Sequence, residues 1–344
     1  MKNYIINLIL ITILVSCAPK IKNFDLYQKQ FLTKSQFLPD KESLEGKAAK
    51  IVVFPFTEND NQVATQAAVG VSIANEIENV VSQNRLGALV DRSAARKLEQ
   101  EIKLSEMNKT GSYKGPQVAD YAVSGSISNA GFTKKYSDGS TYINPKTGAI
   151  NTIPPKFTYS SEVAGNLKIY ELPSMAVVEN IEFKGGAVRK EDVQQNGGVS
   201  LGGFRIGGTQ AVGIDRDDAL VRNAAKAAIK NVVVDLKNAL AHKGFVLEKR
   251  VLEKKTIFKI SIGSNLAIKN GDKFEVIGQY EIENPITGET EIERRIIATG
   301  VISNIIDPKS SWVVLDDEKN TSKIRLGDAV KMKYKKNFLS LFML

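Results

Sequence analysis

The sequence of 344 residues is poor in the side chains that most often perform catalysis or bind metals. It contains a single cysteine, Cys17, and a single histidine, His242. No disulfide can form within the chain, and zinc sites or nucleophile–base pairs have almost no residues from which to be built. We therefore expect no metal and no cofactor other than a covalent lipid, and we predict that the protein is not an enzyme.

A phosphate-binding loop of the form G-x-x-x-x-G-K-[ST] is also missing. Glycine pairs occur at 185–186, 197–198, 202–203 and 207–208. None stands between an expected strand and an expected helix, which is where a phosphate cradle must lie. The carboxylate pairs Asp217/Asp218 and Asp316/Asp317 are typical of a helix start and of a turn. A carboxylate-only active site stays open, but no spacing argues for it.

The charge balance favours no nucleic-acid partner. The formal net charge is +9, but 47 Lys and Arg residues are scattered among 38 Asp and Glu residues. A nucleic-acid footprint would instead gather its basic residues into one patch. We predict a solvated, mildly basic surface and no nucleic acid bound to it.

No apolar run reaches the roughly 20 residues that a membrane-spanning helix needs. The stretch Tyr4–Val15 has the length of the apolar part of an export signal and follows Lys2. Leu14 and Ser16, before Cys17, resemble a bacterial lipobox. We predict a signal peptide at 1–16, removed so that Cys17 becomes an acylated first residue carrying lipid such as palmitate. A plain secretory signal with an incidental cysteine is the alternative.

The mature chain is expected to begin with a tether. Residues 17–46 are polar and rich in lysine, so we predict an extended segment that reaches away from the membrane. One folded domain is expected at 47–248 and a second at 249–335, because the chain length suits about two domains.

The first domain shows alternating strand and helix patterns. Strands are expected at Lys50–Phe56, Gly87–Val90 and Ala122–Ile127, separated by a helix at Gln62–Val81 and by another that opens near Asp91. This order predicts an α+β or α/β fold with part of its sheet uncovered.

A long strand of period two follows a polar, turn-rich segment at 137–155. Its apolar face carries Phe157, Tyr159, Val163 and Leu167. A second alternating stretch at 196–213 changes parity at Gly202-Gly203, which predicts a bulge. Both stretches indicate long β-hairpins.

The segment Asp215–Lys243 predicts one long helix that is capped by Asp215 and stopped by Gly244. His242 would lie in its last turn. We expect it to be a surface histidine rather than a ligand or a base, since no partners for either role are evident.

The region 249–335 has no helical period. Its strands are expected at Thr256–Ile262, Lys273–Gly278, Ile292–Ile302 and Trp312–Leu315. Two phrases, "AIKNGDKFEVIG" and "KIRLGDAVKMKY", each place a Gly-Asp turn before a strand. Short strands and repeated turns predict a small closed β-barrel of SH3-like size. The apolar tail at 336–344 would pack on this domain or touch a membrane surface.

The order of these parts resembles CsgG, the family of curli production assembly and transport lipoproteins. The phrases that carry the resemblance are "KIVVFPF", "GALVDRSAARKLEQE", "ADYAVSGSIS" and "VAGNLKIYELPSMAVVENIEF" within 47–243. The C-terminal region is similar instead to the terminal domain of the flagellar assembly lipoprotein FlgT. The curli family lacks such a domain.

The resemblance implies a homo-oligomeric ring in the bacterial outer membrane, facing the periplasm, which exports unfolded or secreted protein cargo. Each subunit would contribute two hairpins, 129–167 and 177–214, to one transmembrane β-barrel, with the tip of the second near Arg189–Gly197. In the first hairpin Phe157, Tyr159, Val163 and Leu167 would face the membrane.

Two departures from the family pattern leave alternatives open. Lys134 shares parity with apolar residues, so it lies at the membrane interface or the first hairpin is not in the bilayer. The loop that matches the family's pore neck is short and has no aromatic residue; it consists of Glu58, Asn59, Asp60, Asn61 and Gln62. A pore would have a wider or differently lined neck, or the protein is a non-pore lipoprotein that scaffolds partners in the periplasm.

Overall fold

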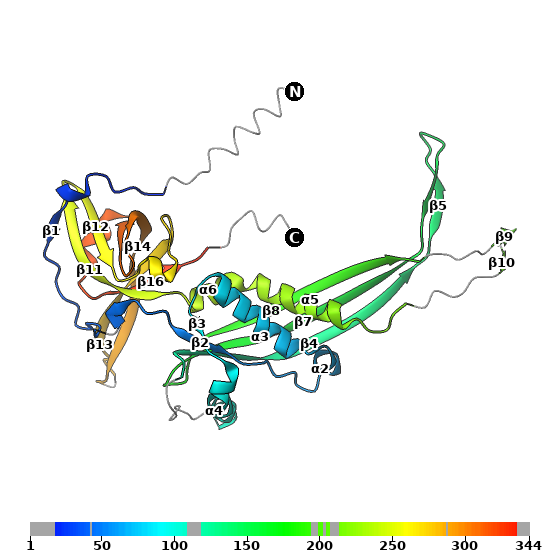
Figure 1. The fold of residues 1–344 in the computed structure, drawn as a ribbon, viewed down its shortest axis with the longest axis horizontal. Helices are drawn as coiled ribbons and strands as arrows, with labels where there is room; N and C mark the ends of the chain where they lie inside the picture. The colour runs from blue at the N-terminus through cyan, green and yellow to red at the C-terminus, as the bar shows by residue number, and fades with distance from the viewer. Residues whose placement is uncertain are drawn as a thin grey trace. The chain divides into compact units, whose positions relative to one another are not determined.

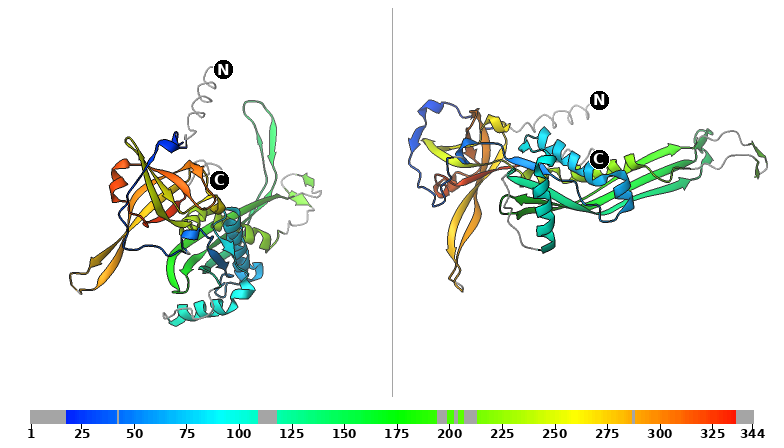
Figure 2. Two further views of the ribbon diagram at one scale, coloured as in Figure 1. Left: turned by 60° about the vertical axis from the view of Figure 1, so that its left-hand side comes forward. Right: turned by 60° about the horizontal axis from the view of Figure 1, so that its bottom comes forward.

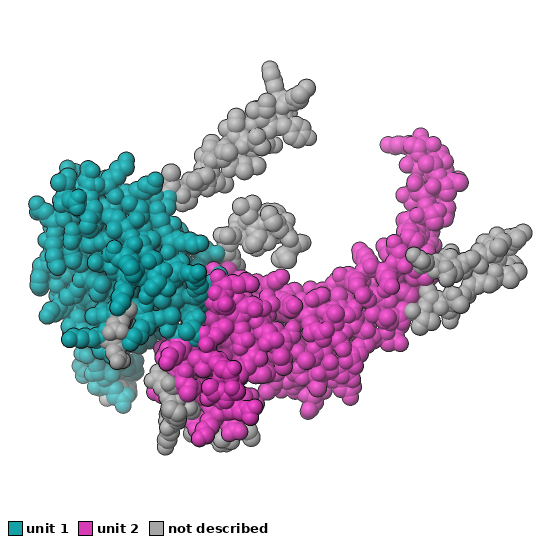
Figure 3. Space-filling model, in the orientation of Figure 1, with its two compact units in different colours: residues 1–49, 84–88, 240–344 teal, residues 50–83, 89–239 magenta. Residues whose placement is uncertain are grey.

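A computed structural model of the chain describes residues 18–41, 43–108, 118–193, 199–201, 204–206, 213–286 and 288–335. The chain divides into two compact units (Figure 3). Unit 1 comprises residues 1–49, 84–88 and 240–344, and unit 2 comprises residues 50–83 and 89–239. The mixed α/β class is confirmed. The expected signal peptide, Cys17 and the apolar tail lie outside the described residues.

Unit 2 is organised around a sheet with the strand order β3-β2-β4-β7-β8 (Figure 1). β2 and β4 run parallel, whereas β4, β7 and β8 are antiparallel neighbours. The strands are β2 (Lys50–Val53), β3 (Ala88–Leu89), β4 (Tyr121–Ser137), β7 (Lys156–Glu171) and β8 (Ala176–Asp192). The alternation of strands and helices that the sequence predicts up to β4 is confirmed.

Two short hairpins belong to the same unit. They are formed by β5 (Ser140–Ile143) with β6 (Ile150–Ile153), and by β9 (Val199–Leu201) with β10 (Phe204–Ile206). Figure 1 shows β5 beyond the far end of the long strands β4 and β7. β8 is the last strand of the sheet, so the second predicted hairpin has no return strand paired with β8 among the described residues.

The helices cover parts of both faces of this sheet. They are α2 (Gln62–Ala67), α3 (Val69–Gln83), α4 (Arg96–Asn108), α5 (Asp218–Asn231) and α6 (Val233–Ala239). α3 and α5 lie along one face, and α5 packs on β7 and β8 (Figures 1 and 2). α4 covers the opposite face near β2, where Leu98 and Ile102 pack with Ala122 and Tyr170.

The single long helix that we predicted at 215–243 is wrong in its bounds. Asp217, not Asp215, caps α5, and its carboxylate accepts a hydrogen bond from the Leu220 N–H at 3.0 Å. The helix is interrupted at Val232, and α6 ends at Ala239. Residues from Lys243 onward form a strand because their apolar side chains are needed in the core of unit 1. Helical periodicity cannot show where tertiary contacts take over.

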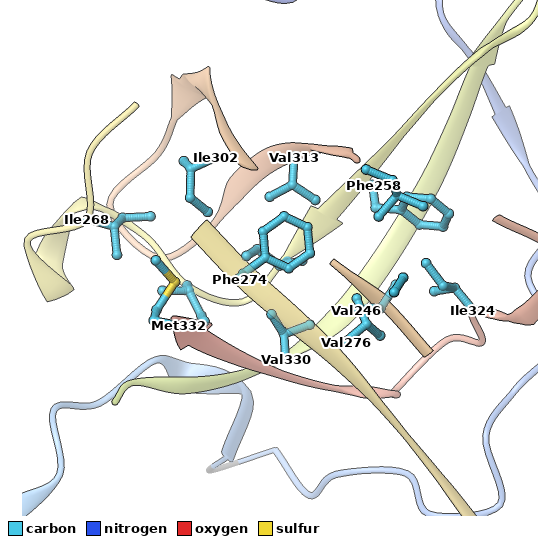
Figure 4. Close-up of a cluster of buried hydrophobic side chains, with 14 of the residues drawn as sticks. Val246, Phe258, Ile268, Phe274, Val276, Ile302, Val313, Ile324, Val330 and Met332 are labelled. Atoms are coloured by element: carbon cyan, nitrogen blue, oxygen red, sulfur yellow. The ribbon is translucent and has the colours of Figure 1, made fainter. Parts of the chain in front are cut away.

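Unit 1 contains a closed antiparallel sheet. Its strands are β11 (Lys243–Leu252), β12 (Lys255–Ile260), β13 (Lys273–Glu283), β14 (Thr290–Ile306), β15 (Ser311–Leu315) and β16 (Ala329–Lys333). They pair in the order β11-β12-β15-β14-β13-β16, and β16 pairs back onto β11. Figure 4 shows side chains such as Phe258, Phe274 and Val313 gathered in the core that this closure encloses.

The two repeated phrases form equivalent turns in this sheet. Gly271 and Gly327 have φ angles of +95° and +87°, a region that favours glycine. The carboxylate of Asp272 accepts a hydrogen bond from the Lys269 N–H at 2.7 Å, and that of Asp328 accepts one from the Arg325 N–H at 2.7 Å. The turns lead into β13 and β16, so the predicted role of the repeats is confirmed.

Residues 18–46 are not the free tether that we predicted. The strand β1 (Gln28–Gln30) pairs with β11, and the side chains of Ile21 and Tyr27 are buried. Phe24 packs edge-on against Trp312 with ring centroids 5.0 Å apart. A segment with apolar residues at every third position can bury them on a neighbouring sheet, despite its lysines.

Candidate functional site

The candidate functional region is the long antiparallel sheet β4-β7-β8 with its hairpin β5–β6. In the register, Phe157, Tyr159, Val163 and Leu167 point to one face of β7, as the period-two pattern predicts. Their exposed fractions are 0 to 8 %. Phe157 and Tyr159 pack with Leu220 of α5. In this structure a helix of the same chain covers this face. That the face lies against a membrane stays a prediction.

The sequence pattern could not separate these two outcomes. An alternating strand shows that one face is apolar, but lipid and an amphipathic helix bury that face equally well. α5 has its own apolar stripe, including Leu220, Ala224 and Ala228, and this stripe needs a partner. The pairing of the two apolar surfaces satisfies both within one chain.

Residues 213–217 attach the start of α5 to all three long strands. Lys134 of β4 forms an ion pair with Asp215, and the Arg189 guanidinium of β8 lies 3.1 Å from the Asp217 carboxylate. The Ile214 N–H donates a hydrogen bond to the Tyr159 hydroxyl at 3.2 Å. Lys134, which we considered unfavourable in a bilayer, thus has a carboxylate partner.

The loop that we expected near a pore neck lies against β4. Glu58 accepts a hydrogen bond from the Gly70 N–H at 2.9 Å, and the Asn59 side chain donates one to the Ile127 carbonyl at 3.3 Å. Asp60 and Gln62 are exposed, and Gln62 is the first residue of α2.

Asn61 links this loop to both a helix and the sheet. Its amide N–H₂ donates to the Ala130 carbonyl at 3.1 Å, and its amide oxygen caps α2 by accepting from the Ala64 N–H at 2.9 Å. Two asparagine amides thus bind β4 on either side of its bulge at Ser128, so the loop is held in place by side chains rather than by an apolar anchor.

A hollow of about 550 Å³ lies beside this bulge. It is lined by Ser126, Ser128, Ala164, Gly165, Asn166, Glu182, Phe183 and Lys184. The Asn166 amide oxygen accepts a hydrogen bond from the Ser126 hydroxyl at 2.8 Å. The lining mixes polar with apolar side chains. Sequence reasoning did not find the hollow because its residues come from three strands that only the register brings together.

The β5–β6 hairpin exposes several large apolar side chains. Tyr142, Ile143, Ile150 and Ile153 are 45 to 71 % exposed. Ile143 and Ile150 are directly opposite each other in the register, so they share one face. Four large apolar side chains on one short hairpin are typical of a surface that contacts a partner or a membrane.

Metal-ligand groups, membrane-spanning helices and similarity to known proteins were each considered for these surfaces, and none assigns an activity to them. Within the described ranges, no group of three or more His, Cys, Asp or Glu residues could hold a metal ion. In the same part of the chain, no helix is long and apolar enough to cross a membrane. No family model matches the sequence, and no curated protein matches it.

His242 is buried, so its predicted surface position is wrong. It is 6 % exposed, and its Nε2 lies 2.8 Å from the Arg85 carbonyl, to which Nε2–H donates. Burial lowers the pKa of His242 below its usual value of 6.5. No local pattern indicates this contact, because Arg85 lies 157 residues away in the chain.

The burial of His242 predicts a pH-dependent stability. Below pH 6.5 the unfolded chain binds a proton that the folded chain rejects, so the stability of unit 1 falls as the pH drops from 6.5 towards the lowered folded pKa. One proton limits the slope to about 1.4 kcal/mol per pH unit. Urea unfolding followed by the fluorescence of Trp312, the only tryptophan, measures it.

His242→Gln is the matched control for this titration. Its amide N–H₂ can still donate to Arg85 but does not titrate. We expect the variant to lose the slope between pH 5 and 7. An equal slope in both proteins would contradict the assignment.

The structure also shows an aromatic and cationic cluster that sequence reasoning missed. The Arg250 guanidinium lies 4.9 Å from the Phe24 ring centroid and 5.0 Å from that of Trp312. It also donates to Glu248 at 2.7 Å. The spacing of Ile21, Phe24 and Tyr27 at every third residue is the signal that could have indicated this docking.

Proposed function

We propose that the protein is an outer-membrane lipoprotein of the CsgG type, a subunit of an oligomeric channel or assembly apparatus that exports protein. The observation that carries this proposal is the β5–β6 hairpin. It extends from paired strands of 17 and 16 residues and leaves four large apolar side chains exposed. Membrane strands need about 9–11 residues in an alternating pattern, which the ends of β4 and β7 together with β5 and β6 can supply.

The closed sheet of unit 1 would be an SH3-like domain. Its two equivalent Gly-Asp turns support this proposal, as does the resemblance to the terminal domain of FlgT. Lipid on Cys17 would anchor the chain to the outer membrane, facing the periplasm, and the cargo would be an unfolded secreted protein.

A second candidate is a periplasmic lipoprotein that scaffolds partners and forms no pore. It is favoured by the cover that α5 provides over Phe157, Tyr159, Val163 and Leu167. In this alternative the β5–β6 hairpin contacts a protein partner rather than lipid. The channel and the scaffold use the same exposed apolar surface of the hairpin. They differ in whether lipid or a protein partner covers that surface.

Conductance separates the two candidates. Membrane-extracted protein should run as a large, heat-sensitive oligomer in detergent and should conduct ions in a planar bilayer. Ile143→Asp combined with Ile150→Asp should abolish conductance, because carboxylates on a lipid-facing strand are costly. Both positions are exposed, so the fold should survive.

The control places the same two carboxylates on exposed isoleucines of unit 1, as Ile286→Asp with Ile292→Asp. This control should conduct normally. Absence of conductance from the unmodified protein, together with a soluble, monomeric Cys17→Ser variant, would overturn the channel and favour the scaffold.

A further inference from the structure

Ala18, the first described residue, lies at the Gly271-Asp272 turn of unit 1. The Ala18 Cβ lies 3.3 Å from the position that a Cβ on Gly271 would occupy. Three residues later, the Ile21 N–H donates a hydrogen bond to the Asn304 side chain at 2.7 Å, and the Ile21 side chain is buried. The N-terminal segment is therefore held against unit 1 from Ala18 onward.

The other end of the described chain lies at the same turn. Lys333, the last residue of β16, is directly opposite Lys273 in the register. Tyr334 follows, and burial together with the charge of Asp272 raises its pKa to about 12. Asp272 is the neighbour of Gly271, so Ala18 and Tyr334 both lie near the Gly271-Asp272 turn. The residues that follow 335 are mostly apolar, "KNFLSLFML".

Exposed lysines surround this turn. Lys20 and Lys22 flank Ile21, Lys269 and Lys273 flank the turn, and Lys335 follows Tyr334; all five are exposed. Glu275 pairs with Lys333 at 3.1 Å. Asp272 accepts the Lys269 N–H and keeps its negative charge, but the five exposed lysines outnumber it. A surface of this kind attracts anionic lipid headgroups.

The covalent geometry leaves no spacer between this surface and an acylated Cys17. Consecutive Cα atoms are about 3.8 Å apart, so the Cα of Cys17 lies within that distance of the Cα of Ala18. Acyl chains on Cys17 would enter the bilayer beside the turn rather than at the end of a long tether. The buried contacts of Ile21 and Tyr27 prevent residues 18–30 from lengthening that link unless the contacts break.

We propose that the basic end of unit 1, defined as Ala18, Lys20, Lys22, Lys269, Lys273 and Lys335, lies against the bilayer surface and binds anionic phospholipid headgroups. This proposal rests on the lipid anchor of the proposed function and adds an orientation to it. Unit 1 then lies on the membrane surface. The Lys273 end of β13 is near the bilayer, and the Glu283 end is farther from it.

Site-specific quenching tests this orientation in the full lipidated chain. A fluorescent maleimide is attached to Lys273→Cys and, as the matched control, to Glu283→Cys; both positions are exposed on β13. The Cys17 sulfur does not react once it carries lipid. The protein is reconstituted into vesicles of phosphatidylethanolamine and phosphatidylglycerol that contain a lipid with a nitroxide headgroup.

The two positions are about 33 Å apart along the strand, so headgroup quenching should be at least about twofold greater at position 273 than at position 283. Aqueous iodide should quench position 283 more strongly. Equal quenching at both positions, or quenching at neither while the protein floats with the vesicles, overturns the proposal. Protection of position 273 from both quenchers also overturns it and indicates a second copy of the chain there.

Failure of the anchor itself gives a different result. Protein that does not float with the vesicles, and that carries a maleimide on Cys17, has no lipid on Cys17. That outcome overturns the lipoprotein assignment and, with it, the orientation that rests on it. If the protein floats with the vesicles and Cys17 does not react with the maleimide, the lipid anchor is present. A negative quenching result then contradicts only the proposed orientation.

Discussion

Val163→Asp should unfold unit 2 of the Cys17→Ser chain at room temperature. Val163 is fully buried on β7, opposite Gly185 in the register, and Gly185 lies against α5. A carboxylate there has no partner, and the cost of several kcal/mol is comparable to the whole stability of a typical domain, about 5–15 kcal/mol. Far-ultraviolet circular dichroism measures the loss, because in the described ranges every α-helix belongs to unit 2.

Thr158→Asp is the control on the opposite face of the same strand. Thr158 is half-buried and is paired with Lys135 of β4 and Lys190 of β8. A carboxylate between two lysines should change the free energy of unfolding by less than about 0.5 kcal/mol. If Val163→Asp is tolerated as well as Thr158→Asp, this face of β7 is not covered by α5 in the soluble protein.

Gly185→Ala should destabilise unit 2 by at least about 3 kcal/mol, at the upper end of the range for overpacked cores. A Cβ at Gly185 would lie 2.2 Å from the Ala228 N atom and 2.5 Å from its Cα, both in the backbone of α5. A helix backbone cannot yield as a flexible side chain does. The helix must therefore move away from β8, and urea unfolding followed by circular dichroism measures the cost.

Gly186→Ala provides the matched control one residue further along β8. A Cβ at Gly186 would meet only the Ser161 carbonyl, at 3.4 Å, and Gly186 is exposed. We expect a change within about 0.5 kcal/mol, since both glycines lie in the same strand and differ only in which face they present. A loss of similar size in both variants would mean that glycine flexibility, rather than contact with α5, sets the effect.

Local patterns predicted most strands and their facing residues. The alternation at 157–169 defines β7 and its buried face, and the two Gly-Asp phrases mark the starts of β13 and β16. These features succeed because they depend on short-range geometry: side chains alternate along a strand, and a positive φ favours glycine.

Predictions that needed a partner from elsewhere in the chain failed. The lysines in 17–46 suggested a solvated tether, but Ile21 and Tyr27 are buried on unit 1. Likewise, His242 looked exposed at a helix end, but it meets Arg85 from a segment more than 150 residues away. No local window contains both members of such a contact.

The sequence by itself determined the alternation of strands and helices, the apolar face of β7 and the scarcity of catalytic side chains. Tertiary structure alone decided what covers that face and where residues 18–46 lie. The reason is that the hydrophobic effect rewards removal of apolar area from water without specifying the partner. Lipid, a helix or a second subunit can each satisfy an apolar strand, and here α5 of the same chain does so.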